Sequence, residues 1–276
     1  MDGIIDNLTN ALNTWNEKLA EIWVLLTQSP QDFKEGGIWQ AVVSIHQGLQ
    51  AIGLALLVLF FVIGVAKTCS NLNEVKRPEQ ALRLFIRFAI ARGLVVYGME
   101  LMLKIFEIVQ GITSTIMNTV GVGNATTTTL PQSVIDAVEN AGFLESIPLW
   151  AVTLLGGIFI TVLSFVLILT VYGRFFKLYM YTAISPIPLA ASASESTQNI
   201  AVTFIKSYAG VCMEGAIIVL SCIIFSKFAA SPPAVDETAS AVNMLWSYVG
   251  EVIFNMLILV GTVKMSDHVV KDMLGL

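Results

Sequence analysis

Long apolar runs separated by short polar segments make up most of this sequence. A transmembrane helix needs about 20 mainly apolar residues, and five runs reach that length. We therefore predict five transmembrane helices, over residues 39–66, 84–109, 148–178, 202–225 and 242–263. The third run remains apolar and aromatic to about residue 181, so this helix is expected to tilt or to project beyond the membrane.

The N-terminal segment shows a helical period instead of a continuous apolar run. At about 100° per residue, its apolar side chains fall within an arc of about 100°. These side chains are Ile4, Ile5, Leu8, Leu12, Trp15, Leu19, Ile22, Trp23 and Leu26. The opposite face carries Asn, Asp and Glu, which makes the segment too polar to span a bilayer. We predict an amphipathic helix over residues 4–26 that lies on the membrane or packs against a neighbouring copy. Its acidic polar face favours a protein partner over anionic lipid.

The first 37 residues lack the positively charged start of a signal peptide, so we expect them to stay on the mature protein. This divides the chain into an extracytoplasmic segment, residues 1–37, and a transmembrane domain, residues 38–276. Between the second and third spans, residues 111–145 form a loop without Lys or Arg, with one short helix predicted over residues 132–140.

Composition supports membrane insertion. Apolar residues make up 55% of the chain and charged residues only 13%, against roughly 25% charged residues in average soluble proteins. The net charge of -5 argues against a nucleic-acid-binding domain, which is usually basic. The three cysteines have no metal-site spacing and are interpreted as small buried side chains.

The distribution of basic residues predicts the orientation, because cytoplasmic loops are enriched in Lys and Arg. Only Lys18, Lys34 and Lys227 fall in segments assigned to the outside. Ten fall in segments assigned to the cytoplasm: Lys67, Lys76, Arg77, Arg83, Arg87, Arg174, Lys177, Lys206, Lys264 and Lys271. The predicted fold is therefore an all-α integral membrane protein with its N-terminus outside and its C-terminus in the cytoplasm.

Several polar residues lie within the predicted spans. They are Arg92, Glu100, Lys104, Glu107, Glu214, Glu251 and Asn255. A charge inside a bilayer is costly, so these side chains must face protein or water. They either line a water-filled path or join helices and subunits, with pairs three or four residues apart neutralising each other.

Individual members of this set lead to more specific hypotheses. Lys104 and Glu251 are expected at similar depth, where they pair if their helices touch. Glu214 has no charged neighbour on its own helix, which makes it the better candidate for a functional group. His46, in the first span, is interpreted as a hydrogen-bonded histidine, with a proton relay as the alternative.

Two cytoplasmic features have open interpretations. The basic cluster of Lys67, Lys76, Arg77, Arg83 and Arg87 either meets DNA or a cytoplasmic ATPase, or only sets the topology beside anionic lipid. Pro186 and Pro188 predict a helix break, because proline lacks a backbone donor and restricts the residue before it. That break is either a gate or hinge, or a plain exit from the membrane.

The sequence lacks a GxxxxGK[ST] loop, an HExxH or GxSxG motif, and any spaced Cys/His cluster. We expect no catalytic activity and no cofactor, so energy for transport comes from a gradient or a partner. A membrane-bound enzyme is the weakest of the hypotheses considered.

The order of elements resembles a known family. The third span ends in Arg174-Phe175-Phe176-Lys177-Leu178-Tyr179, an aromatic and basic belt, followed by Ile184-Ser185-Pro186-Ile187-Pro188-Leu189-Ala190. With the acidic N-terminal helix and five spans, this is similar to TrbL-type conjugal transfer proteins, the polytopic inner-membrane subunits of type IV secretion systems. The chain is compact compared with family members that carry long soluble C-terminal extensions, so functions attached to such extensions are not carried over.

The resemblance implies a channel or scaffold subunit that forms a homo-oligomeric ring in the bacterial cytoplasmic membrane. It implies that DNA bound to a relaxase, or protein, passes near or through the ring, and that separate ATPases drive transfer. The competing hypothesis is a small-solute permease or the membrane subunit of a multi-component transporter.

Overall fold

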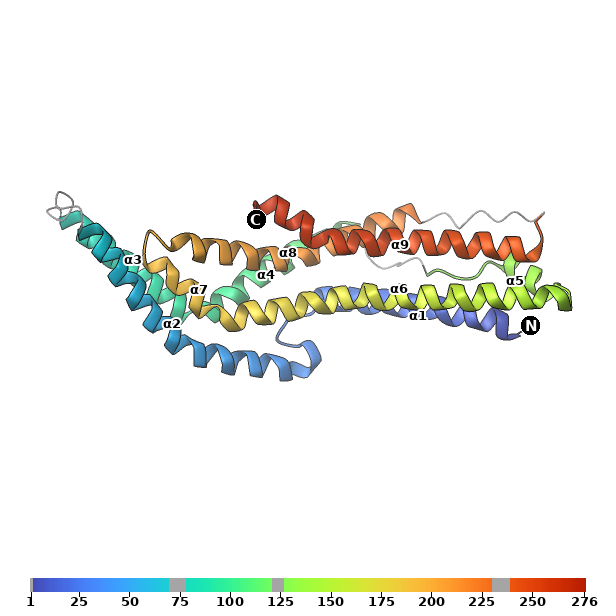
Figure 1. Cartoon of the computed structure of the whole chain (residues 1–276), viewed down its shortest axis with the longest axis horizontal. Coiled ribbons are helices and arrows are strands. Elements are labelled where there is room, and N and C mark those ends of the chain that lie inside the picture. Colours follow the sequence, from blue (N-terminus) through green and yellow to red (C-terminus); the bar gives the residue numbers. More distant parts are fainter. Residues whose placement is uncertain (1, 70–77, 121–126, 230–238) are drawn as a thin grey trace. The chain divides into compact units, whose positions relative to one another are not determined.

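The computed structural model describes residues 2–69, 78–120, 127–229 and 239–276, and every regular element in these ranges is a helix (Figure 1). The predicted all-α fold class is therefore confirmed for the described residues. The α-helices are α1 (Asp2–Thr27), α2 (Gly37–Cys69), α3 (Pro78–Val96), α4 (Gly98–Val120), α5 (Gln132–Glu139), α6 (Phe143–Ile184), α7 (Pro186–Ala190), α8 (Gln198–Phe228) and α9 (Ala241–Leu274). Two short 3-10 helices are η1 (Phe33–Gly36) and η2 (Ala191–Ala193).

Four segments of the described chain are helical, long and apolar enough to cross a membrane. They are Phe33–Lys67, Glu145–Ile184, Gln198–Phe228 and Ala241–Leu274. These segments contain the first, third, fourth and fifth predicted spans. With 42 residues, α6 is about 63 Å long at 1.5 Å per residue, which is about twice the thickness of a hydrocarbon core.

The second predicted span, residues 84–109, is not one helix. The chain forms α3 and α4, which meet at Tyr97, where one turn separates them. A side chain at Gly98 would meet Leu189 Cδ1 at 3.1 Å. Gly98 therefore lets the backbone approach α7 closely, and glycine is a common cause of a helix kink. Neither α3 nor α4 is among the four candidate spans.

Two helices continue well past the ends that the sequence predicted. The helix α4 continues to Val120, so the loop predicted from residue 111 begins later. The helix α9 continues through the predicted C-terminal tail to Leu274. The short helix predicted in the loop is present as α5.

The chain consists of two compact units, each with most of its contacts within itself. Unit 1 comprises residues 1–27, 113–172 and 216–266, and unit 2 comprises residues 28–112, 173–215 and 267–276. The helices α4, α6, α8 and α9 each contribute residues to both units.

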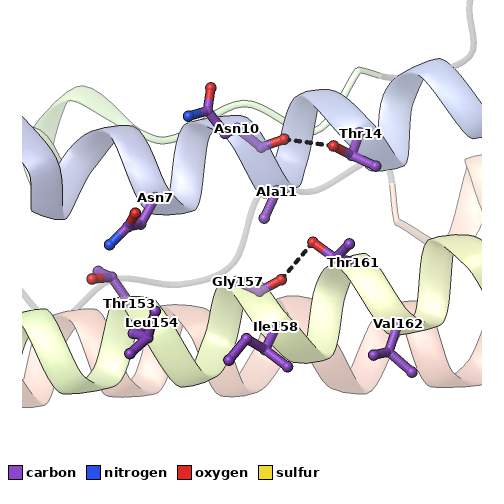
Figure 2. A pocket seen from close by; sticks show the side chains of 10 residues that line it. All are labelled: Asn7, Asn10, Ala11, Thr14, Thr153, Leu154, Gly157, Ile158, Thr161 and Val162. Carbon is purple, nitrogen blue, oxygen red and sulfur yellow. Dashed lines mark hydrogen bonds between the residues drawn. The ribbon is translucent and has the colours of Figure 1, made fainter.

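In unit 1, α1 lies beside the first half of α6, as Figure 2 shows. The predicted apolar face of α1 is largely buried, including Leu8, Trp15 and Ile22. A Cβ atom at Gly157 of α6 would lie 3.6 Å from the Ala11 Cβ, so the two helices approach closely there. We predicted that the apolar face of α1 meets the membrane or a neighbouring copy. For these residues the prediction is wrong, because the chain itself buries the face.

The polar face of α1 also contacts protein. The Asn16 side chain donates a hydrogen bond to the Thr128 carbonyl at 3.0 Å, and its amide oxygen accepts one from the Thr128 N–H at 3.0 Å. A groove between α1 and α6 is lined by small and polar side chains together with Leu154, Ile158 and Val162 (Figure 2). The Thr14 and Thr161 hydroxyls at its rim each donate to a carbonyl of their own helix.

In unit 2, α7 and η2 pack against α2 and α3. A Cβ atom at Gly53 of α2 would lie 2.7 Å from the Pro186 carbonyl oxygen, so the two backbones touch. Pro186 and Leu189 are buried, while Pro188 is half-buried. The predicted helix break therefore lies at Ser185, and the chain after it is a short helix packed in the core of unit 2. Because this short helix is buried, the segment differs from an exposed loop that only leads out of the membrane.

Candidate functional site: a buried charge cluster

Arg174 is the most deeply buried cation among the described residues. Its side chain belongs to the part of α6 in unit 2, and the residue is only 3% exposed. The guanidinium Nε donates to the Val211 carbonyl at 3.2 Å, and Nη2 donates to the Cys212 carbonyl at 3.3 Å. These carbonyls belong to α8, so Arg174 connects α6 to the backbone of α8.

The surroundings of Arg174 fit its planar charged group. A Cβ atom at Gly215 of α8 would lie 2.5 Å from Arg174 Cζ, so only glycine leaves room for the guanidinium. Arg174 Cζ also lies 5.9 Å from the ring centroids of Phe106 and Phe175. At such distances the negative faces of aromatic rings attract a cation. The charge is thus stabilised by carbonyl dipoles and aromatic rings.

Lys177, one helical turn after Arg174, is the centre of an ion-pair network. Its ammonium donates to Glu214 of α8 at 3.0 Å and to Asp267 of α9 at 3.2 Å. Lys271 donates to the other carboxylate oxygen of Asp267 at 2.8 Å. The network links three helices within unit 2, and its two lysines balance its two carboxylates.

Glu214 is the deepest carboxylate of this charge cluster, which we define as Arg174, Lys177, Glu214, Asp267 and Lys271. Glu214 is 5% exposed. It has no charged neighbour on its own helix, and its partner, Lys177, comes from α6. Removing one partner of a fully buried ion pair costs about 3–5 kcal/mol, because it leaves an uncompensated charge. The Lys177 side chain is 40% exposed, so the lower end of this range applies here. This geometry favours a role in holding α6, α8 and α9 together, and a pore-lining role for Glu214 stays a prediction.

The charge cluster also corrects the interpretation of the aromatic and basic belt. Phe176 is exposed, as expected of a belt residue, but Arg174, Phe175 and Tyr179 are buried. Phe175 stacks on Phe33 with ring centroids 4.4 Å apart. One face of this part of α6 is therefore core, and only the other face is available to a membrane interface.

His46 of α2 is buried and hydrogen-bonded. Its Nδ1 lies 3.0 Å from the Thr182 carbonyl oxygen and 3.3 Å from the Ser185 hydroxyl. Because a carbonyl only accepts, Nδ1 carries the proton in the bond to Thr182. The Gln50 amide, one turn further along α2, donates to the Val96 carbonyl at 2.9 Å. The interpretation of His46 as a hydrogen-bonded histidine is confirmed.

The other charges predicted inside the spans lie at the surface of the chain. Arg92 of α3 and Glu100, Lys104 and Glu107 of α4 are exposed, as is Glu251 of α9. Lys104 Nζ lies 2.6 Å from Glu107 Oε2, so these two neutralise each other within one helix. Glu251 belongs to unit 1 and Lys104 to unit 2, and their predicted pairing stays a prediction. Asn255 is half-buried.

The structure describes three of the five residues of the predicted basic cluster. Lys76 and Arg77 lie outside the described residues. Lys67 of α2 and Arg83 of α3 are exposed, while Arg87 lies 3.6 Å from Glu195.

Sequence reasoning missed Asp267 and Lys271 as partners of the buried charges, and it placed Arg174 and Lys177 only at a membrane surface. One signal was present, because Arg174 and Lys177 are three residues apart and therefore share a helix face. The unpartnered Glu214 also required a cation from another helix. Among the described residues, no group of three or more His, Cys, Asp or Glu side chains could hold a metal ion.

Comparison with known proteins identifies a family. Residues 15–186, more than half of the chain, match the family described as TrbL/VirB6 plasmid conjugal transfer like protein. No curated protein and no solved structure matches the chain.

Proposed function

We propose that this chain, which belongs to the TrbL/VirB6 plasmid conjugal transfer family, is a channel or scaffold subunit of a conjugative type IV secretion apparatus. The family match over residues 15–186 is the observation that carries the proposal. The four long apolar helices agree with a multi-pass membrane subunit. In this role the protein contributes to translocation of DNA or protein and performs no catalysis of its own.

We further propose that the subunit is a homo-oligomer in the bacterial cytoplasmic membrane. The Lys104 and Glu107 side chains are 71% and 56% exposed, although they lie in a helix flanked by apolar segments. Exposed charges at membrane depth need protein or water as neighbours. Contact between copies, or an aqueous path enclosed by them, supplies such neighbours for these residues and for Arg92, Glu100 and Glu251.

Affinity purification in mild detergent tests this proposal. Native mass spectrometry of the tagged protein is expected to show oligomers, together with other subunits of the secretion apparatus. A strictly monomeric protein without associated subunits would contradict it. Replacement of Lys104 and Glu107 by Ala and Leu should lower the oligomer fraction. The same replacements at Lys227 and Asp272, exposed charged residues outside α3 and α4, serve as the matched control.

The orientation proposed here places the N-terminus outside and the C-terminus in the cytoplasm, with five crossings. In this arrangement α3 and α4 together form the second crossing, bent at Tyr97. The excess of basic residues in the segments assigned to the cytoplasm supports it. Single cysteines at Thr127 and Glu195, both exposed, should react with a membrane-impermeant thiol reagent from opposite sides. Labelling of both positions from one side would contradict the topology.

Cytoplasmic ATPases are the proposed source of energy. The sequence has no phosphate-binding GxxxxGK[ST] loop. We therefore propose that a partner protein hydrolyses the ATP. Cross-linking in whole cells, followed by identification of linked proteins, is expected to recover at least one ATPase of the apparatus.

A further inference from the structure

A polar pocket lies between α2 and α3 in unit 2, next to the chain that leads into α8. Two cations line it, Lys67 from α2 and Arg87 from α3. The remaining polar lining comes from Ser194, Glu195 and Ser196. This pocket is separate from the buried charge cluster described above.

The pocket is built by close packing of its walls. A Cβ atom at Gly64 of α2 would lie 3.0 Å from the Ser194 hydroxyl, so glycine lets this side chain lie against α2. The Ser194 backbone carbonyl accepts hydrogen bonds from the Thr197 and Gln198 N–H groups at 3.2 and 2.9 Å. These bonds hold the turn that presents the two serine hydroxyls, which lie 3.0 Å apart.

The charges of the pocket favour an anion. Arg87 lies 3.6 Å from Glu195, whose side chain is 83% exposed, so this ion pair is long and solvated. Such exposed pairs contribute little and are readily exchanged for another anion. Arg83, four residues before Arg87 on α3, is an exposed cation on the same helix face, outside the lining of the pocket. Among the described residues, the lining combines two cations with one exposed carboxylate, and the serine pair, which shares one hydrogen bond, leaves one hydroxyl proton for a ligand. This set of donors suits a phosphate group.

The surface around the pocket favours a lipid as the source of that phosphate. In the most apolar stretch of the span that contains α2, only 11% of the residues are buried by the rest of the chain. Val62 of α2 and Phe85 and Ile90 of α3 are each more than half exposed. Apolar side chains of a membrane helix that are not covered by protein face acyl chains. A ligand in this pocket therefore meets cations at one end and hydrocarbon-facing surface at the other.

We propose that Lys67, Arg87, Ser194 and Ser196 bind the phosphate of an anionic phospholipid, with its acyl chains along α2 and α3. Basic pockets between transmembrane helices are known to hold such headgroups. The site concerns how the chain is embedded in the membrane, so its failure would leave the transfer function above unaffected.

Native mass spectrometry of the full-length protein in neutral detergent tests the site. Phosphatidylglycerol is expected to bind at least one copy per chain, while phosphatidylcholine at the same concentration does not. The K67Q/R87Q double variant should bind phosphatidylglycerol about thirtyfold more weakly, from about 1 kcal/mol per basic residue. The K227Q/K264Q double variant, which loses the same charge at exposed positions elsewhere, should bind as the unchanged protein does.

A second variant keeps the test valid if the double variant fails to fold. Glu195→Gln removes the carboxylate beside Arg87 and should tighten phosphatidylglycerol binding severalfold. Equal binding of the two lipids, or an unchanged affinity in both K67Q/R87Q and E195Q, would overturn the site. Displacement of the lipid by inorganic phosphate or a short oligonucleotide at equal concentration would overturn it in favour of a soluble anion.

Discussion

The guanidinium of Arg174 lies against the backbone of Gly215, where a Cβ atom would stand 2.5 Å from Cζ. The absence of a side chain on α8 at this point is what allows a buried cation from α6 to reach the Val211 and Cys212 carbonyls. The two helices are therefore joined by a charged group whose fit depends on the glycine.

Gly215→Ala is expected to destabilise the protein by about 2–3 kcal/mol. The new methyl group displaces the guanidinium from its carbonyl partners, and hydrogen bonds of a charged group contribute about 1.5–3 kcal/mol. Gly261→Ala on α9 is the matched control, because a Cβ atom there meets nothing within 4 Å. Thermal unfolding in detergent measures both variants, and equal unfolding midpoints would refute the packing described for Arg174.

Lys177→Met is expected to cost about 3 kcal/mol, because it leaves Glu214 buried without its cation. The Lys177→Met/Glu214→Gln double variant should be more stable than the sum of the two single changes predicts, with an interaction energy of about 0.5–3 kcal/mol. Chemical unfolding of the four proteins of this cycle gives that energy. Strict additivity would show that the two side chains are not coupled.

Gly53→Ala is expected to shift α7 away from α2. A Cβ atom at this position lies 2.7 Å from the Pro186 carbonyl oxygen, and backbone cannot rotate aside as a side chain can. Overpacking of this kind costs about 1–3 kcal/mol. Gly48→Ala on the same helix meets open space and is the control. Proteolysis of the 185–197 segment should accelerate in the first variant only, and similar cleavage of both would count against the contact.

A disulfide is expected between α1 and α6 in the Ala11→Cys/Gly157→Cys variant. The Ala11 Cβ and a Cβ at Gly157 are 3.6 Å apart, within the usual disulfide range of about 3.5–4.5 Å. The three native cysteines are replaced beforehand. Ala11→Cys/Phe159→Cys is the control, since Phe159 lines a groove with α9 residues. A faster-migrating oxidised band should appear for the first pair alone, and its absence would contradict the placement of α1 on α6.

The elements that the sequence predicted well are those determined by local pattern. The helical period over residues 4–26 anticipated α1 and the apolar face that Leu8 and Trp15 share, because this face repeats through the whole segment. It did not show that the chain itself buries the face. Four of the five predicted spans lie within candidate spans because their apolar runs are long and contain few charged residues. The kink at Tyr97 was not predicted, because it depends on packing of Gly98 against Leu189, which lies 91 positions further along the chain.

The charge cluster also depends on contacts between residues that are distant in the chain. Glu214 was singled out as a functional candidate because it has no charged neighbour on its own helix, but its pairing with Lys177 depends on how α6 and α8 pack. Asp267 could not be assigned because α9 was expected to end before it, and the continuing helix brings it to Lys177. Local patterns thus identified the charged residues, while the packing of distant helices decided their partners.

Transfer frequency in a mating experiment tests the central claim most directly. Donor cells in which this gene is deleted are expected to transfer the mobile element no better than donors that lack the whole apparatus. Supplying the gene in trans should restore transfer, while Gly215→Ala should restore it less well than Gly261→Ala. Unchanged transfer by the deleted donors, especially together with a defect in uptake of a small solute, would contradict the account.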